Sequence, residues 1–267
     1  MLSFLARFCP AAVSEGRAAR MGIVNATPDS FSDGGLYADP EAAAAQAERL
    51  LRAGADLIDL GAESTRPGFA PVSEEEESRR LIPALRAIRR RCPEAVVSVD
   101  TRKASVARAA LEAGAALVND VSALGDPSMA ELVRSSGCGI VLMNGWPEHV
   151  GARSRAAGPG ALGAWVEQGL ADALARADRA GIARDCLCLD PGFGFGLRHA
   201  DNAEVLDALP GLVAKFSPIP FLVGASRKHF LRDLYPEVTD SDEASRRFHD
   251  RCMAAGAKIV RAHEFGI

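Results

Sequence analysis

Short apolar runs alternate with longer alanine-rich stretches along most of this 267-residue chain. In each repeat, a helical pattern ends at a glycine and a short apolar strand follows within a few residues. The repeats are "AERLLRAGADLIDLG", "ARAALEAGAALVNDV", "AELVRSSGCGIVLMN", "ADRAGIARDCLCLD" and "DRCMAAGAKIVRAH". Glycine accepts the left-handed conformation that ends a helix. Strands that alternate with helices in this way predict parallel βαβ units.

Three further apolar segments, "MGIVN", "AVVSVD" and "PFLVGAS", bring the number of predicted strands to eight. Eight such units in about 250 residues predict an α/β fold, a closed (β/α)8 TIM barrel. An open doubly wound sheet is the alternative, but its usual glycine-rich fingerprint after the first strand is missing from the sequence. We expect residues 1–20 to form an N-terminal extension and residues 21–267 to form a single barrel domain.

Composition and charge narrow the class of protein. The chain is 48% apolar and 25% charged, with a net charge of −4, which is ordinary globular material. No segment gathers basic residues with interleaved aromatics, so the footprint of a nucleic-acid partner is missing. The six cysteines form no CxxC pair, which argues against a zinc site or a disulfide framework and favours reduced thiols in the cytoplasm. No apolar run approaches the ~20 residues of a membrane span.

Polar side chains follow almost every predicted strand. In chain order they are Asn25; Glu63 to Gly68; Asp100; Asn119 and Asp120; Met143 and Asn144; Asp190; Ser226 to Lys228; and Arg261 with His263. One Asp or Asn after a strand is more often a helix cap or turn residue. In a barrel, however, all eight strand ends converge on the one mouth that carries the active site. Eight polar ends together therefore predict a functional site there.

The acceptors at this mouth suit a flat heterocycle. Asp100, Asn119 and Asp190 offer two carboxylates and an amide. A carboxylate that faces an amidine-like edge makes paired, charge-assisted hydrogen bonds. A ring with several N–H donors and carbonyl acceptors is the expected ligand.

The remaining polar residues suit an anion. Cationic or potentially cationic side chains favour a phosphate or a carboxylate; they are Lys228, Arg261 and His263. Asn25, with Asp29 and Asp33 in the polar run that follows, supplies oxygen ligands for Mg²⁺ carrying a phosphate. The mouth is therefore interpreted as a group-transfer site.

Seven segments resemble, in order, the motifs of the dihydropteroate synthase family. They are "MGIVNATPDSFSDGG", "GAESTRPG", "SVDTRK", "VNDV", "DPGFGFG", "GASRK" and "VRAH", and together they extend from Met21 to His263. The resemblance implies a (β/α)8 barrel that condenses 6-hydroxymethyl-7,8-dihydropterin pyrophosphate with 4-aminobenzoate, releasing pyrophosphate, in folate synthesis. It also implies inhibition by sulfonamides.

The resemblance further implies roles for individual residues. The pterin contacts would be Asp100, Asn119, Met143, Asp190 and Lys228. Pyrophosphate would be held by Asn25, through Mg²⁺, and by Arg261 and His263. The aminobenzoate side would comprise Phe31, Thr65, Arg66, Pro67, Phe195 and Lys228, with His229 beside them. The implied catalytic residues are Asn25, Thr65, Arg66, Lys228, Arg261 and His263. No nucleophilic side chain is needed, because an electron-rich dihydropterin can stabilise a methylene cation while the enzyme stabilises the departing anion and excludes water.

Some positions depart from the family pattern. Asn144 and Gly145 stand where the family has His-Met, Leu197 replaces a lysine, and His229 replaces a serine near the aminobenzoate carboxylate. The sequence ends soon after the eighth predicted strand, so we expect a barrel that lacks the last helix. The preceding segment, "DSDEASRRFHDRCMAAGA", is more charged than the family's dimer helix, which favours a monomer or a weak homodimer.

Two alternative functions remain at this point. A paralogue with weakened catalysis could bind pterin, and the substituted positions and the missing last helix favour it. A pterin-dependent methyltransferase domain shares the barrel and its ring-binding carboxylates, but the intact "NATPDSFSDGG" and "ESTRPG" segments count against it. The partners expected in every case are small molecules.

Overall fold

Eight parallel strands form one sheet in the computed structural model, which describes residues 3–26, 39–62, 72–144, 160–195, 197–198 and 200–265. The hydrogen-bonded order is β6-β5-β4-β3-β2-β1-β8-β7. A parallel bridge between Leu189 and Phe221 joins the two ends of this order, so the sheet closes on itself. The strands are β1 (Ala19–Asn25), β2 (Leu57–Gly61), β3 (Val96–Asp100), β4 (Leu117–Asp120), β5 (Gly139–Met143), β6 (Leu187–Asp190), β7 (Leu222–Val223) and β8 (Ile259–Ala262).

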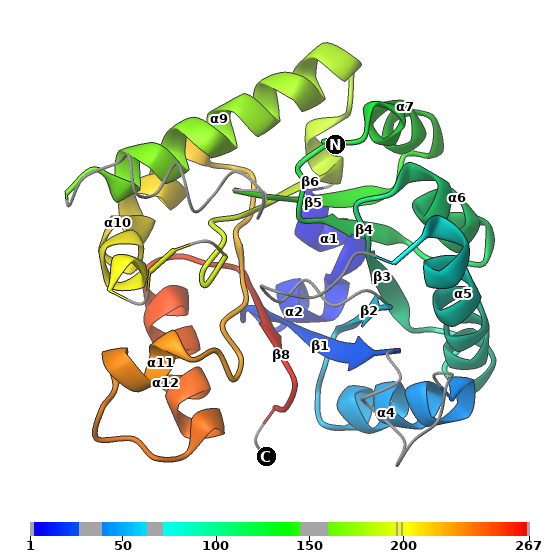
Figure 1. Cartoon of the computed structure of the whole chain (residues 1–267), viewed down its shortest axis with the longest axis horizontal. Coiled ribbons are helices and arrows are strands. Elements are labelled where there is room, and N and C mark those ends of the chain that lie inside the picture. The colour runs from blue at the N-terminus through cyan, green and yellow to red at the C-terminus, as the bar shows by residue number, and fades with distance from the viewer. Residues whose placement is uncertain are drawn as a thin grey trace.

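Helices surround the barrel and cover the outward side chains of its strands (Figure 1). They are α4 (Pro40–Arg52), α5 (Glu74–Arg91), α6 (Ala104–Glu112), α7 (Pro127–Ser136), α9 (Leu162–Ala180), α10 (Asp201–Phe216), α11 (Phe230–Leu234) and α12 (Ser241–Ala254), with a 3-10 turn at Arg184–Cys186. The predicted (β/α)8 barrel is confirmed. Within the described residues, no helix follows β8, and no helix has the length and apolar character needed to cross a bilayer.

Local sequence accounts for the helix boundaries. The Ser73 hydroxyl accepts the backbone N–H of Glu76 at 3.2 Å, and α5 has four glutamates in its first turn and three arginines in its last. These charges oppose the helix dipole and so stabilise both ends. Gly137 and Gly181 end α7 and α9 with φ of 65° and 74°, as the alanine–glycine pattern predicted.

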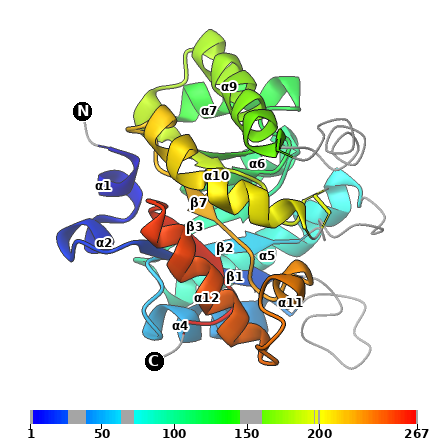
Figure 2. The ribbon, with the colours of Figure 1, turned by 90° about the vertical axis from the view of Figure 1, so that its left-hand side faces the viewer.

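Two short helices, α1 (Phe4–Phe8) and α2 (Pro10–Ser14), close the amino-terminal end of the barrel. Figure 2 shows them at the left edge of the molecule, whereas α11 lies toward the right. Their buried side chains pack against inward residues at the base of the strands. This cluster consists of Phe4, Phe8, Cys9, Ala12, Ala19, Met21, Leu57, Leu117, Val141, Cys188, Leu222 and Ile259. A Cβ atom at Gly139 would lie 2.8 Å from the Phe8 ring, so the ring's approach to β5 requires glycine there.

Candidate active site at the carboxyl end of the barrel

Strand register brings the predicted polar residues to one level of the barrel. Asn25 pairs with Gly61, Gly61 with Asp100, and Asp100 with Asn119 in the parallel register. On the opposite side, Met143 pairs with Asp190. Buried side chains at this level are Asp100, Asn119, Met143 and Asp190. The convergence expected from the strand ends is therefore present in the fold.

A guanidinium held between two carboxylates lies at the centre of this level. Arg261 Nε donates to Asp59 Oδ2 at 2.5 Å, and Arg261 Nη2 donates to Asp100 Oδ2 at 2.8 Å. Asn119 Nδ2 also donates to Asp59 Oδ2, at 3.1 Å. Asp59 thus fixes residues from β8 and β4 at once, because its carboxylate is fully buried inside the barrel.

Sequence reasoning missed Asp59. It sits in the middle of the apolar strand "LIDLG" and not at its end, two residues before Gly61. Successive strand residues point to opposite faces, so this spacing places Asp59 on the same inward face as Gly61, one level below the mouth. A charged residue inside a strand with apolar neighbours was the signal that could have identified it.

Three buried oxygen atoms near Arg261 have no hydrogen-bond partner among the described residues. They are Asp59 Oδ1, Ser98 Oγ and Asp100 Oδ1. Buried polar atoms in native proteins nearly always have a partner. A partner for these oxygens would have to come from outside the described residues.

Asp190 and Lys228 form a second polar group across the mouth. Asp190 Oδ1 accepts the backbone N–H of Gly192 at 2.8 Å. Lys228 Nζ donates to the backbone carbonyl of Phe193 and lies 4.1 Å from the centroid of the Phe195 ring. The contact between the ammonium and the ring face is a cation–π interaction, which holds Phe195 beside Lys228.

Burial changes the charge state of these groups. It raises the pKa of Asp100 to about 7 and that of Asp190 to about 6. It also lowers the pKa of Lys228 to about 7. The neighbouring carboxylates, meanwhile, hold the Arg261 guanidinium in its charged form, so its pKa lies above the usual value despite burial. The mouth thus keeps one permanent positive charge among groups that titrate near neutral pH.

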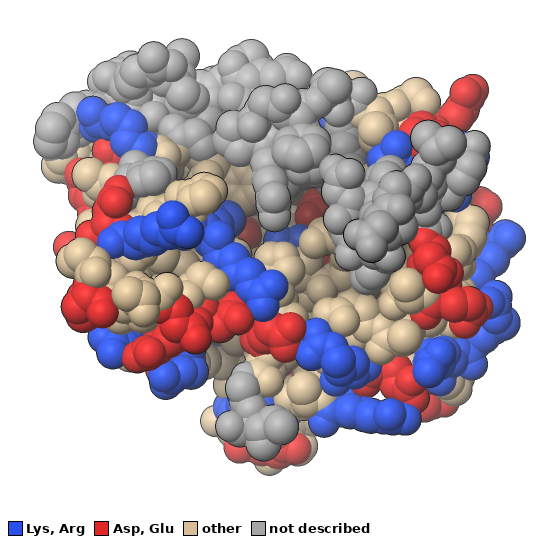
Figure 3. Space-filling view, turned by 60° about the horizontal axis from the view of Figure 1, so that its bottom comes forward, with Lys and Arg blue, Asp and Glu red and all other residues tan. Residues whose placement is uncertain are grey.

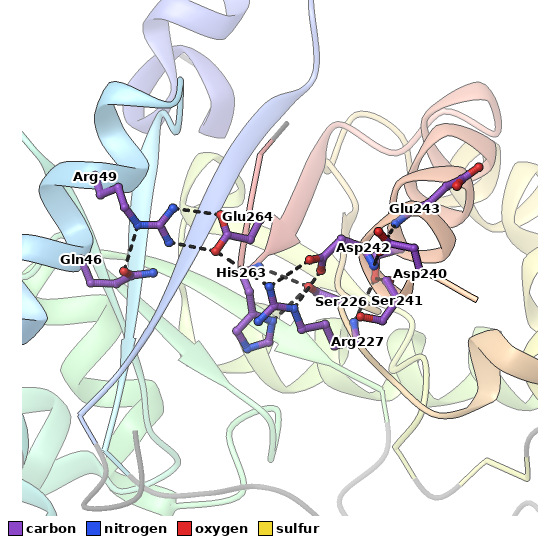
Figure 4. Close-up of polar contacts among 11 residues, drawn as sticks. Gln46, Arg49, Ser226, Arg227, Asp240, Ser241, Asp242, Glu243, His263 and Glu264 are labelled. Carbon is purple, nitrogen blue, oxygen red and sulfur yellow. Dashed lines mark hydrogen bonds and ion pairs between the residues drawn. The ribbon is translucent and has the colours of Figure 1, made fainter. Parts of the chain in front are cut away.

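His263 lies at the end of β8 and is attached to the loop after β7. Its Nδ1 is 3.0 Å from Ser226 Oγ, and its backbone N–H donates to the same oxygen at 3.2 Å (Figure 4). Asn25 is half-buried at the end of β1. His229 is exposed, at the residue that precedes α11.

The substituted positions near the β5 and β6 loops are buried. Asn144 donates through its backbone N–H to the Asp190 carbonyl at 2.8 Å, and its Nδ2 is 3.5 Å from the Pro191 carbonyl. Leu197 is 8% exposed. Asn144 therefore ties the end of β5 to the end of β6. Several predicted residues lie outside the described part of the chain, namely Asp29, Phe31, Asp33, Thr65, Arg66, Pro67 and Gly145.

A metal site made only of protein ligands is not found among the described residues, which contain no group of three or more His, Cys, Asp or Glu side chains placed to hold an ion. Mg²⁺ keeps several waters and commonly binds one or two protein oxygens together with substrate phosphates. The amide oxygen of Asn25, at the carboxyl end of β1, fits that coordination.

The fold and the site together define a (β/α)8-barrel enzyme with buried acceptors for a nitrogen-rich ring and basic groups beside them. Residues 21–263 match the family model described as pterin binding enzyme. The chain is 40% identical over 250 residues to the dihydropteroate synthase of Escherichia coli K12, covering 91% of this chain and 86% of that one. It is 37% identical over 260 residues to the Streptococcus pyogenes enzyme of the same name, covering 94% and 92%.

The solved structures that resemble this chain are also of dihydropteroate synthases. The dihydropteroate synthase of Xanthomonas albilineans with 4-aminobenzoic acid has a TM-score of 0.83 and 40% identity, over 93% of this chain and 88% of that one. The same enzyme in complex with 7,8-dihydropteroate has a TM-score of 0.79 and 37% identity, with the same coverage. The chain belongs to the pterin-binding enzyme family, and the similarity extends to that family's dihydropteroate synthases. The resemblance seen in the sequence motifs is confirmed.

Proposed function

We propose that this chain is a dihydropteroate synthase that condenses 6-hydroxymethyl-7,8-dihydropterin pyrophosphate with 4-aminobenzoate in folate synthesis. The observation that carries the proposal is the buried group of Asp59, Asp100, Asn119 and Arg261, in which Asp100 Oδ1 has no hydrogen-bond partner among the described residues and would accept a ring N–H. The similarity to enzymes of this name over most of the chain supports the same reaction.

The buried acceptors would bind the pterin ring. Asp190 and Asn119 would pair with the pterin edge, Asp100 would accept a further ring N–H, and Met143 would contact the ring face. Lys228 would donate to a ring acceptor from the opposite side. A ligand placed here is largely shielded from water, which strengthens each of these hydrogen bonds.

The pyrophosphate group would be bound by Asn25, Arg261 and His263. Arg261 uses Nε and Nη2 on the two carboxylates, and a guanidinium has five N–H groups in all, so donors remain for a phosphate oxygen. When bound, Mg²⁺ would neutralise part of the pyrophosphate charge, and Asn25 is the residue that would hold it. The bond between the ring's methylene carbon and the pyrophosphate oxygen breaks. The aminobenzoate nitrogen bonds to that carbon and loses a proton.

The second substrate is assigned to the outer part of the mouth. Phe195, stacked on Lys228, and the exposed His229 are the described residues that would contact aminobenzoate. Phe31, Thr65, Arg66 and Pro67 complete this set in the proposal. A sulfonamide would compete with aminobenzoate here. All six cysteines are free in the structure, which supports a cytoplasmic location.

The proposal is tested by measuring pyrophosphate release with and without 4-aminobenzoate, together with binding of 6-hydroxymethylpterin by calorimetry. We expect release that depends on aminobenzoate. Asp190→Ala should lose about 1–3 kcal/mol of pterin binding, because ring donors would be left unpaired in a buried site. The matched control is Asp207→Ala, whose exposed carboxylate lies on α10 and should not affect binding. Pterin binding without pyrophosphate release would instead identify a paralogue that has lost catalysis.

A further inference from the structure

The loop between β7 and α11 connects the two ends of the proposed site. Ser226 contacts His263 at the anion end, and Lys228 contacts the Phe193 carbonyl at the ring end. Arg227 lies between them with φ of 59°, a backbone conformation that side chains other than glycine rarely adopt. A residue held in this region at a site needs surrounding contacts to keep it there.

Those contacts come from α12 and from Glu264, which follows β8, as Figure 4 shows. The backbone N–H of Arg227 donates to Ser245 Oγ at 2.9 Å, and its guanidinium donates to both carboxylate oxygens of Asp242 at 2.8 and 3.0 Å. Glu264 lies 3.8 Å from the same guanidinium and accepts two hydrogen bonds from Arg49 of α4, each 2.9 Å long. Ser226 is therefore fixed against the end of β8, since its neighbour Arg227 is anchored on three sides.

The hydroxyl of Ser226 has two polar contacts among the described residues, and both are with His263. It is buried, it accepts the backbone N–H of His263 at 3.2 Å, and it lies 3.0 Å from Nδ1. A backbone N–H can only donate, so the oxygen acts as the acceptor in the first contact. The hydroxyl proton then has one acceptor within reach, which is Nδ1.

This arrangement determines where the imidazole carries its proton. If Nδ1 were protonated, the Ser226 oxygen would receive two donors and its own proton would be buried without an acceptor, which is unfavourable. If Nδ1 is unprotonated, it accepts the Ser226 proton, and the Ser226 oxygen still accepts the backbone N–H of His263. A neutral imidazole that accepts at Nδ1 carries its proton on Nε2.

We propose that Ser226 is a positioning residue that fixes the ring orientation of His263 and holds it as the Nε2–H tautomer. Under the proposed function, on which this role rests, Nε2 then carries the proton that a hydrogen bond to the leaving diphosphate anion requires. A donor fixed in advance stabilises developing charge without having to reorient during the reaction.

The tautomer of His263 can be determined without measuring catalysis. The full chain is labelled with ¹⁵N in its five histidines, and long-range proton–nitrogen NMR spectra are recorded above the titration range of histidine, with His263 assigned from the signal lost in His263→Gln. We expect Nδ1 of His263 to show the shift of an unprotonated ring nitrogen and Nε2 that of a protonated one. A protonated Nδ1 in the wild-type chain overturns the proposal.

Two substitutions then separate positioning from folding. Ser226→Ala should move the His263 ring shifts toward an average of the two tautomers and lower kcat roughly tenfold, with a smaller change in KM. Ser226→Thr keeps the hydroxyl and should restore both the shifts and kcat. Ser135→Ala removes an exposed hydroxyl that bonds a helix carbonyl on α7, so it serves as the matched control and should change neither.

These experiments test the role of Ser226 and the proposed function separately. Unchanged ring shifts in Ser226→Ala overturn the role of Ser226, whatever the kinetics. Shifts that move as expected in a protein without pyrophosphate release would support the tautomer assignment and count against the proposed function instead.

Discussion

Burial shifts the pKa of three ionisable side chains at the mouth of the barrel. Asp190 and Asp100 have pKa values raised to about 6 and about 7, and Lys228 has one lowered to about 7, in each case mainly because burial disfavours the charged form. These groups therefore change charge within the range in which the protein would work, so ligand binding should depend on pH.

The affinity for 6-hydroxymethylpterin should rise with pH. Because the pKa of Asp190 is raised, its carboxyl stays protonated up to about pH 6, and only the ionised form can accept two ring N–H groups. Calorimetry from about pH 5 to about pH 8 should show binding that strengthens through about 6. In Asp190→Asn the increase in pterin affinity near pH 6 should disappear. A smaller increase near pH 7, caused by ionisation of Asp100, should remain. A flat profile in the wild type would exclude an ionised Asp190 as the ring partner.

Asp59 should contribute to stability as well as to the site. Removing its carboxylate in Asp59→Ala leaves Asn119 without that acceptor and Arg261 with Asp100 alone. We expect a loss of about 3 kcal/mol in the free energy of unfolding, the lower end of the range for a broken buried ion pair, because one partner remains.

Urea denaturation measures this loss. Asp178→Ala breaks an exposed ion pair with Arg184 and should cost at most about 1 kcal/mol. If the two variants were equally stable, Asp59 would not be the residue that holds Arg261 in place.

Chain order alone locates some site residues and not others. Asp100, Asn119 and Asp190 lie at the ends of strands. Because the carboxyl ends of all parallel strands in a barrel lie at the same face, the sequence predicts that these residues converge. Asp59 was missed, and Ser226 was predicted at a strand end but not its contact with His263, because these two residues act on residues 37 to 202 positions away through register and the path of a loop. The apolar pattern carries no information about these contacts.

The alternation of helix and strand could be predicted because each repeat contains a glycine that ends its helix. All eight strands lie where apolar runs predicted them. The opening twenty residues were less informative, since their apolar run is broken by Arg7 and Pro10. In the structure, Pro10 starts α2, and Arg7 donates to the Gly137 carbonyl beside the base of the barrel.

The two N-terminal helices should matter for stability and not for binding. Phe4 is 1% exposed within the cluster at the base of the barrel. Phe4→Ala should lower the free energy of unfolding by about 3–5 kcal/mol, because it removes a buried ring and leaves a cavity. Pterin affinity should stay the same, since the mouth lies at the other end of the strands.

Urea denaturation and calorimetry on the same variant test both parts. Val13→Ala on α2, where the side chain is 48% exposed, is the control and should have little effect. A wild-type free energy of unfolding in Phe4→Ala would show that these helices only rest on the barrel.

Charge is spread over the surface of the whole molecule. Basic and acidic side chains are interspersed on the face shown in Figure 3. On α12, the exposed residues are mostly charged and include Arg246, Arg247, Asp250 and Arg251. The centre of a stable interface is depleted of charged residues, so this helix is poorly suited to a tight dimer.

We therefore expect a monomer or a weak homodimer in solution. Multi-angle light scattering at micromolar concentration should give a mass near 28.1 kDa that rises only at higher concentration. A constant mass of twice that value over the whole concentration range would contradict the expectation.

The pairing of β1 with both β2 and β8 has a consequence for biosynthesis. Ala19 is synthesised well before one of its strand neighbours, Ile259, which lies 240 positions further along the chain. Until then, one edge of β1 has no hydrogen-bonding partner, and the rings of α1 lack part of the apolar surface they cover in the finished barrel. Contacts so distant in sequence form slowly, and open strand edges promote aggregation. A nascent chain that stalls before β8 would thus expose both an unpaired edge and an apolar surface, which are the features that molecular chaperones bind.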